Sequence, residues 1–430
     1  MSPPPMPEDV EEASLLVEEE YEKALKEHME DLERRQRSLS AEFFIIARQK
    51  KIIMRLVLLL LPIVFFNGLC KSDVMTAPMH KGELQALYLV IQGFTGNSWN
   101  VSQLYPDPCG WTPIQGVSCD IFHKLWSVTS INIGPVFENS LACTPQANFN
   151  QYIFGLKHLR SLSFFNCFSS QHPTKIPSNA WKHLSESLEN LEFRSNEGLV
   201  GKIPKSFGHL TNLKSLVLVE NSLTGEVPQE LANLVNLKKL SLSSNALSGR
   251  IPASLGYNNS MNQLLILDFS RNSITGPIPS SLGSMISLLK LDLSNNNLNG
   301  MLPLELGNLR NLTLLDIRNN NISGELTQSL QCMASLQDML MSNNQLDGRI
   351  MEFRWDNLRN LINLDLANNS ITGEIPESMI SLKRLRYIAL DNNQIIGSVP
   401  SKFCIFAMSQ GPLSAWQQFD RKTSVFSRIL

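Results

Sequence analysis

Apolar residues recur along most of the chain in one spacing, in which positions i, i+3 and i+5 precede an asparagine at i+8. Residues 288–303, LLKLDLSNNNLNGMLP, show it most clearly, with a further leucine at i+10 and a glycine at i+12. The frame begins at residues 188, 213, 237, 264, 288, 312, 336, 361 and 385, and weaker copies begin at residues 128 and 159. A repeat of about 24 residues predicts an α/β solenoid of about eleven stacked coils, with a parallel β-sheet on its concave face.

Each position of the repeat has a physical role. Leu291 and Leu293 lie two residues apart, so they point to the same side of a short strand, into the coil. Asn296 ends the strand, and its amide offers a donor and an acceptor to buried backbone groups of the neighbouring coil. Gly300 permits backbone angles that larger residues resist. An irregular return segment is expected after the glycine, because several copies place a proline there: Pro228, Pro252, Pro279 and Pro376.

The first 72 residues differ from the repeats. Residues 1–53 are acidic and then basic, which is typical of an exposed helix or a disordered arm. Residues 54–72 carry the apolar run LVLLLLPIVFF between basic and small residues, which predicts a secretory signal peptide; the run is too short for a transmembrane helix. Because signal peptides begin proteins, we expect Met54 to be the start and residues 1–53 to be a gene-model artefact. The alternative is a genuine extension that leaves a signal anchor or a cytosolic form.

Residues 73–127 are expected to cap the first coil, whose apolar end would otherwise face water. Apolar residues within 83–93 follow helical spacing, and Trp111 lies farther along. We expect this helix, the tryptophan and a disulfide bond to form a compact N-terminal cap.

The cysteines indicate disulfide bonds rather than a metal site. A secreted chain favours pairing of Cys109 with Cys119, and Cys143 with Cys167 is the second candidate pair. No CxxC motif is present and the histidines are scattered, so no metal ligand set is expected. Cys332 and Cys404 are expected to stay unpaired, because three coils at about 5 Å per strand separate them by more than a disulfide spans.

Composition changes this interpretation little. The net charge is −2 and no strongly basic face is evident, so nucleic acid is not an expected partner, and no cofactor is expected either. Residues 128–403 hold the repeats, whereas residues 404–430 show no repeat frame and no closing cap, which we interpret as truncation or a misread exon. No kinase signature is present. Five sequons fit a glycosylated, secreted surface: Asn100, Asn258, Asn311, Asn321 and Asn368.

The frame LxxLxLxxNxLxGxIP and the cap sequence DPCGWTPIQGVSCD resemble the plant-specific class of extracellular leucine-rich repeat proteins. Longer stretches, such as LYLVIQGFTGNSWN and LENLEFRSNEGLVGKIP, are similar to a group of receptor-like proteins of the plant cell surface that have no kinase domain. The resemblance runs from about residue 83 to 403. It implies a role in the response to a beneficial root-colonising fungus.

Outward-facing strand residues form rows across the predicted concave face. Asp268, Asp292, Asp316 and Asp365 share the central row, which would suit a basic peptide or protein. Alternatively, LDLS is simply the consensus sequence of the repeat at these positions, and the aspartates are ordinary polar surface residues. Val217 and Val219 are expected to form a small exposed apolar patch that favours a partner. Residues that depart from this consensus sequence are the better candidates for ligand binding: Glu192, Arg194, Val217, Val219, Arg318, Leu340 and Tyr387.

The leading hypothesis is a non-enzymatic recognition protein, secreted or at the cell surface, that binds a protein, peptide or microbial ligand. A receptor kinase is a candidate co-receptor. The protein itself could associate with the plasma membrane peripherally or through an anchor. The alternative is a secreted inhibitor of a microbial wall-degrading enzyme, as in polygalacturonase-inhibiting proteins. A glycosidase is disfavoured, since its two carboxyl groups need a pocket that binds sugar and raises one pKa, whereas the sheet is expected to be flat and open.

Overall fold

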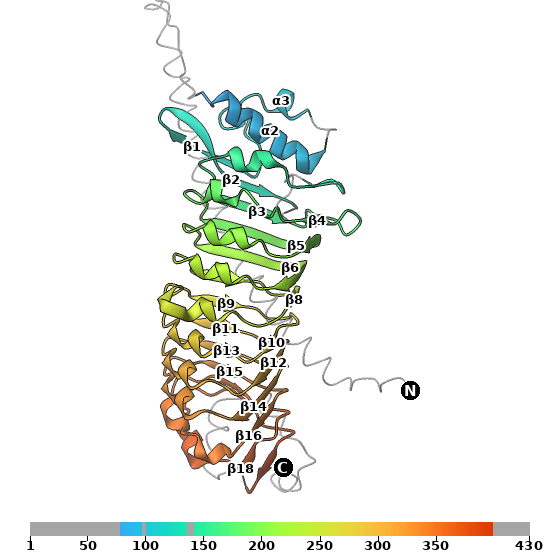
Figure 1. Cartoon of the computed structure of the whole chain (residues 1–430). Coiled ribbons are helices and arrows are strands. Elements are labelled where there is room, and N and C mark those ends of the chain that lie inside the picture. The colour runs from blue at the N-terminus through green and yellow to red at the C-terminus, as the bar shows by residue number, and fades with distance from the viewer. Residues whose placement is uncertain (1–77, 97–99, 136–141, 399–430) are drawn as a thin grey trace, which may run out of the picture. The chain divides into compact units, whose positions relative to one another are not determined.

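The computed structural model describes residues 78–96, 100–135 and 142–398. Parallel strands stack into one long sheet, one strand for each of the eleven predicted coils. Figure 1 shows the strands lying one above the other. An antiparallel hairpin adds a further strand at the N-terminal end. In sheet order the strands are β1 (Val117–Phe122), β2 (Leu125–Ile133), β3 (Ser161–Phe165), β5 (Asn190–Gly201), β6 (Ser215–Glu226), β7 (Lys239–Ser241), β9 (Ile266–Asp268), β11 (Lys290–Asp292), β13 (Leu314–Asp316), β15 (Asp338–Leu340), β17 (Asn363–Asp365) and β19 (Tyr387–Ala389), with β4 (Thr174–Lys175) and β8 (Ala246–Ser248) as side branches.

The core runs through the inside of the coils. Leu291 pairs in register with Leu267 and Leu315 of the neighbouring strands, and all three side chains are fully buried. Leu293 is buried in the same way. Since one coil cannot bury its own apolar side, each depends on the coils before and after it. The predicted parallel solenoid is confirmed.

The repeat asparagines link neighbouring coils, as predicted. The amide oxygen of Asn296 accepts a hydrogen bond from the backbone N–H of Ile274 (3.0 Å) in the preceding coil. Its amide nitrogen donates to the carbonyls of Phe269 (2.9 Å) and Leu293 (3.1 Å). The same pattern recurs at the equivalent asparagines, including Asn320.

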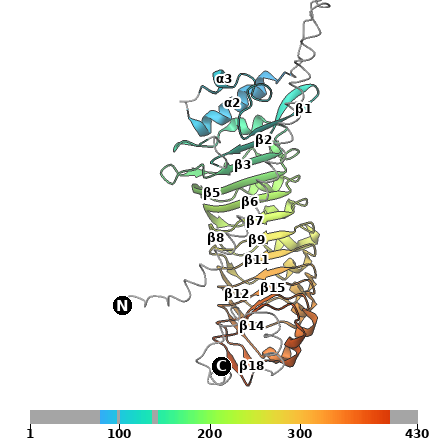
Figure 2. The same cartoon turned by 180° about the vertical axis from the view of Figure 1, so that it is seen from behind.

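The return segment is more regular than predicted. Short strands form a second sheet of β10 (Thr275–Gly276), β12 (Asn297–Gly300), β14 (Asn321–Glu325) and β16 (Gln345–Asp347), and a separate pair of β18 (Thr372–Glu374) and β20 (Gln394–Ile396). Gly300 has φ +79°, the left-handed conformation anticipated for it. Figures 1 and 2 show these strands along one side of the long sheet and short helical turns along the other.

Proline begins a helical turn in this fold rather than preventing one. Pro303, for example, is the extended residue (φ −70°, ψ 142°) directly before the 3₁₀ turn η7 (Leu304–Asn308), and its carbonyl accepts from the N–H of Leu306 (3.2 Å). The other 3₁₀ turns are η1 (Gln151–Gly155), η2 (Trp181–Leu184), η3 (Lys205–His209), η4 (Gln229–Asn233), η5 (Ala253–Asn259), η6 (Ser280–Ser284), η8 (Gln328–Cys332), η9 (Ile350–Glu352), η10 (Trp355–Asn357) and η11 (Glu377–Ser381).

The N-terminal cap contains the predicted helix, now α2 (Lys81–Thr95), followed by α3 (Val101–Leu104). Leu87 and Ile91 are fully buried, and Phe94 stacks on Phe164 of β3 with ring centroids 4.4 Å apart. These contacts join the helix to the core of the first coils.

Both predicted disulfide bonds are present, Cys109–Cys119 and Cys143–Cys167. Trp111 does not help to cover the coil, and that prediction is wrong: its side chain is 74% exposed. The turn that begins at Asp107 directs it outward, since the N–H of Trp111 donates to the Asp107 carboxylate (2.9 Å). Ile114 and Pro108 of this segment are buried instead.

The predicted arm (1–53), signal peptide (54–72) and tail (404–430), with Cys404, lie outside the described residues. The predicted boundaries of the cap and the repeats stay predictions. Cys332 is unpaired and exposed. Across the described ranges, helices long and apolar enough to cross a bilayer do not occur.

Candidate functional site

We call the outward side of the long sheet the sheet face. It is the surface predicted above to be concave. Backbone pairing places the predicted central row in one continuous line, for example Asp268, Asp292 and Asp316 on adjacent strands. From β3 to β19 the row is Ser163, Glu192, Val217, Ser241, Asp268, Asp292, Asp316, Leu340, Asp365 and Ala389.

The first group of candidate residues lies on β5 and β6. Glu192 and Arg194 form an ion pair in which each side chain is 37% exposed. They pair in register with Val217 and Val219 of the next strand. The predicted exposed pair of valines is wrong in part, because Val217 is buried and only Val219 is partly exposed. A small side chain in the central row lies below its longer neighbours, such as Glu192.

The aspartates of the central row are held by short hydrogen bonds along and across the strands. Asp292 accepts from the hydroxyl of Ser294 (2.7 Å), and Asp268 accepts from Ser270 in the same way (2.7 Å). Asp365 accepts from Ser342 of the preceding coil (2.6 Å). Each of these three carboxylates therefore accepts a hydrogen bond from a side chain within the sheet.

Two cations reduce the charge of this row. Arg318 donates to Asp316 through Nη2 (2.9 Å) and through Nε, and Lys290 Nζ lies 3.4 Å from Asp292. Sequence reasoning named Arg318 and missed Lys290. Its spacing from Asp292 could have identified Lys290, since residues at i and i+2 of a strand share a face. Four aspartates against two cations leave a net charge of −2 on these six side chains.

Burial and neighbouring charges shift the pKa values of Asp292, Asp365 and Tyr387 on the sheet face. Burial raises the pKa of Asp292, and the nearby Asp316 carboxylate raises it further. Burial likewise raises the pKa of Asp365. Burial, with the charges of Asp365 and Asp391, raises the pKa of Tyr387 to about 12. The expectation of a fully open sheet is therefore wrong for Asp316 and Asp365, which are 4% and 8% exposed.

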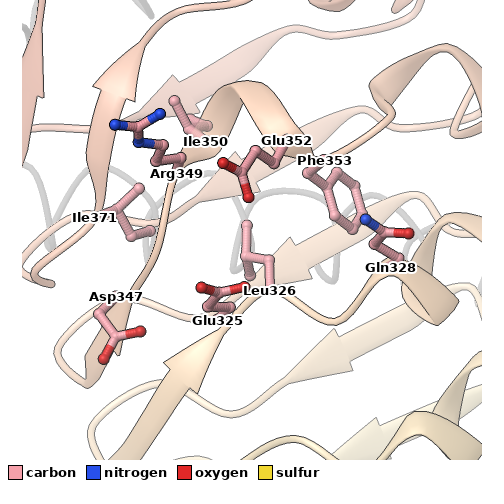
Figure 3. A pocket seen from close by; sticks show the side chains of 9 residues that line it. All are labelled: Glu325, Leu326, Gln328, Asp347, Arg349, Ile350, Glu352, Phe353 and Ile371. Atoms are coloured by element: carbon pink, nitrogen blue, oxygen red, sulfur yellow. The ribbon is translucent and has the colours of Figure 1, made fainter.

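A small hollow lies away from the sheet face, near η9 (Figure 3). Its volume is about 30 Å³, whereas small-molecule sites usually measure several hundred cubic ångströms. Glu325, Asp347, Glu352 and Arg349 line its polar part. In the described ranges, groups of side chains suited to a metal ion do not occur. The hollow offers room for about a water molecule and no catalytic pocket.

The predicted sequons occupy different parts of the fold. Asn100 precedes α3, and Asn258 is part of η5. Asn311 leads into β13, Asn321 begins β14, and Asn368 follows β17. Asn100, Asn311, Asn321 and Asn368 are exposed, so the structure leaves them accessible to modification.

Family models named "Leucine rich repeat" match residues 186–247 and, in four further copies, residues 263–285, 287–309, 311–333 and 360–382. The chain carries leucine-rich repeats and is similar to plant receptor-like proteins. It is 57% identical over 151 residues to Piriformospora indica-insensitive protein 2, and 33% identical over 156 residues to Receptor like protein 29, both from Arabidopsis thaliana. These matches cover 35% and 36% of the leucine-rich repeat chain and 35% and 33% of the relatives, so it spans about a third of their length.

Solved structures show the same architecture. The ectodomain of the Arabidopsis thaliana receptor kinase GASSHO1/SCHENGEN3, in complex with CASPARIAN STRIP INTEGRITY FACTOR 2, matches with a TM-score of 0.63 and 34% identity. That match covers 74% of the leucine-rich repeat chain and 37% of the ectodomain. A plant ice-binding protein matches with a TM-score of 0.55 and 25% identity over 75% and 90% of the two chains. The fold therefore serves more than one function, and function must be argued from the surface.

Proposed function

We propose that this protein is a receptor-like recognition protein that binds a peptide or protein ligand on the sheet face. The observation that carries the proposal is the continuous central row, in which Glu192 on β5 leads to the aspartates of β9 to β13. Arg194 and Val219 lie beside it, in the next outward row of β5 and β6. An extended ligand crossing the strands would meet an ion pair, an apolar side chain and then a net negative charge. The structure of GASSHO1/SCHENGEN3 with its partner supports this use of the fold.

The charge of the row favours a ligand with basic residues at its end over β9 to β13. Among the residues that the structure describes, no cation forms an ion pair with Asp268, whereas Asp292 and Asp316 each have one. We therefore assign the strongest attraction for a cationic ligand residue to Asp268. Complementary charge mainly sets specificity and the rate of association.

The biological setting is proposed from resemblance. Likeness to Piriformospora indica-insensitive protein 2 supports a role in plant–microbe interaction. A location at the cell surface and a receptor kinase as the signalling partner complete this proposal. The alternative, an inhibitor of a microbial polygalacturonase, would act in the cell wall without a membrane partner. Purified protein that blocks a polygalacturonase, and does not fractionate with plasma membrane, would favour the inhibitor.

Val219→Glu tests the proposed site. Val219 is partly exposed, so the substitution should leave the fold intact and place a second carboxylate beside the Glu192–Arg194 ion pair, which changes the charge of the contact. We expect cross-linked capture of ligand from root extracts to fall roughly tenfold or more, the effect of about 1.4 kcal/mol.

Gln229→Glu is the matched control, because it adds the same charge at an exposed position in η4, away from the sheet face. It should capture as much ligand as the wild type. Equal capture by all three proteins would place the binding site elsewhere.

A further inference from the structure

One coil carries an unusual share of the exposed apolar surface. Of the twelve large apolar side chains exposed in the described part of the chain, four lie within residues 286–304, the segment around β11. Ile286 is 57% exposed, Leu289 41%, Met301 70% and Leu304 65%. Exposed apolar clusters usually mark a contact or a tendency to aggregate, so something is expected to cover this segment.

On one edge of the sheet, the apolar residues touch a sequon of the next coil. The side-chain amide of Asn311 donates to the carbonyl of Ile286 (3.0 Å). The hydroxyl of Thr313, the third residue of the same sequon, donates to the carbonyl of Leu289 (2.8 Å). The sequon is thus fixed against the two exposed residues on that edge.

On the other edge of the sheet, a second sequon, which begins at Asn321, lies close to the exposed side chain of Met301. Asn321 pairs in register with Asn299 in the second sheet, and Gly300 pairs with Ile322. Continuing this register places Met301 beside Ser323, the third residue of the Asn321 sequon. A Cβ atom at Gly324 would lie 2.8 Å from Cγ of Met301, so the Met301 side chain lies against the residue that directly follows this sequon.

Equivalent asparagines elsewhere lack both features. Asn212, Asn236 and Asn360 make the same hydrogen bond to the preceding coil, to the carbonyls of Glu186, Thr211 and Ala334. None of these three asparagines begins a sequon. None of the three acceptors is a large exposed apolar residue. Among these equivalent asparagines, a sequon and an exposed apolar acceptor residue therefore coincide at Asn311.

We propose that N-linked glycans on Asn311 and Asn321 cover the exposed apolar residues of segment 286–304. A lipid-linked oligosaccharide would supply the sugar: its C1 bonds to Nδ2 of the asparagine, the lipid diphosphate leaves, and the amide loses one proton. The second N–H of Asn311 stays available for Ile286. The occupant of this surface is thus a bulky, solubilising group of the chain itself. Both glycans lie at the edges of the sheet, so the central row between them stays open to ligand.

The experiment uses full-length protein secreted from plant cells, with Asn311→Gln, Asn321→Gln and both together. Asn368→Gln is the matched control, because the amide of Asn368 neighbours Asn392 and not an exposed apolar side chain. Peptide mass spectrometry should find Asn311 and Asn321 occupied. The double variant should bind a hydrophobic fluorescent dye several-fold more strongly and elute as aggregates, whereas the control should match the wild type.

Two further measurements keep the test independent of folding. Enzymatic release of whole glycans from folded wild-type protein should produce the same rise in dye binding. Replacing Ile286, Leu289, Met301 and Leu304 by serine should return the double variant to a dye-silent monomer. Unoccupied sites, or a glycan-free protein as monomeric and dye-silent as the wild type, would overturn the proposal. Ligand capture is not part of this readout, so failure here leaves the proposed function untouched.

Discussion

Asp292 lies between two other carboxylates of the central row, and its pKa is raised by burial first and by Asp316 second. Its charged form is therefore less favourable in the folded chain than in the unfolded chain, where the pKa is ordinary. We expect Asp292→Asn to unfold at a higher temperature than the wild type at neutral pH, since the amide oxygen can still accept from Ser294.

This advantage should shrink as the pH falls. Below the raised pKa the wild-type carboxyl is protonated, and its ionisation no longer costs stability. The melting temperatures of the two proteins should therefore become equal as the pH falls toward the ordinary aspartate pKa of about 4. Asp356→Asn, at an exposed position in η10, should show no such convergence. A difference between Asp292→Asn and wild type that is constant from pH 4 to about pH 7 would contradict the assigned cause.

Single positions show where sequence reasoning reaches its limit. The frame fixes which residues face outward, so the row from Glu192 to Asp365 could be predicted residue by residue. How deeply a side chain lies within that row could not, because Val217 is buried by neighbours from other coils. The ion pairs of the row could not be predicted for a similar reason. Whether Lys290 reaches Asp292 and Arg318 reaches Asp316 depends on side-chain length and conformation.

The disulfide of the N-terminal cap gives a prediction for one element. Cys109→Ser together with Cys119→Ser should destabilise the cap by about 2–4 kcal/mol, the usual contribution of a structural disulfide. Cys119 pairs with Val128 at the start of the sheet. Hydrogen exchange should therefore rise near Ile131 and Leu162 and change little near Leu364, because each repeat contacts only its neighbours.

Cys332→Ser is the natural control for this experiment. Cys332 is exposed and unpaired, so its replacement should leave exchange unchanged everywhere. Uniform loosening of the whole sheet in the cap variant would show that the disulfide does not act locally.

Among the elements, those with a strict period were predictable and those set by a turn were not. The helix α2 and the eleven strands followed from apolar spacing alone. The second sheet was missed because Asn297–Gly300 shows no long apolar alternation, and its pairing arises only when coils stack. Trp111 was misplaced because a hydrogen-bonded turn, and not its hydrophobicity, sets its direction.

At the scale of the whole solenoid, the asparagine ladder determines how far a local defect spreads. The amides of Asn296 and Asn320 both donate to the carbonyl of Leu293 (3.1 and 3.0 Å). Asn369 makes equivalent bonds three coils farther along, to the carbonyls of Met341 and Leu366. At about 4.8 Å per strand, Asn296 and Asn369 are roughly 14 Å apart and share no partner.

We expect alanine at Asn296, Asn320 or Asn369 to cost about 1–3 kcal/mol each in the free energy of unfolding, because buried backbone groups lose a partner. Asn296→Ala with Asn369→Ala should be additive within about 0.5 kcal/mol. Asn296→Ala with Asn320→Ala should cost more than the sum, since either amide alone still satisfies the carbonyl of Leu293 and the double variant removes both. Denaturant unfolding of the singles and doubles measures this coupling. Equal additivity of the two pairs would mean that the shared carbonyl does not link these coils.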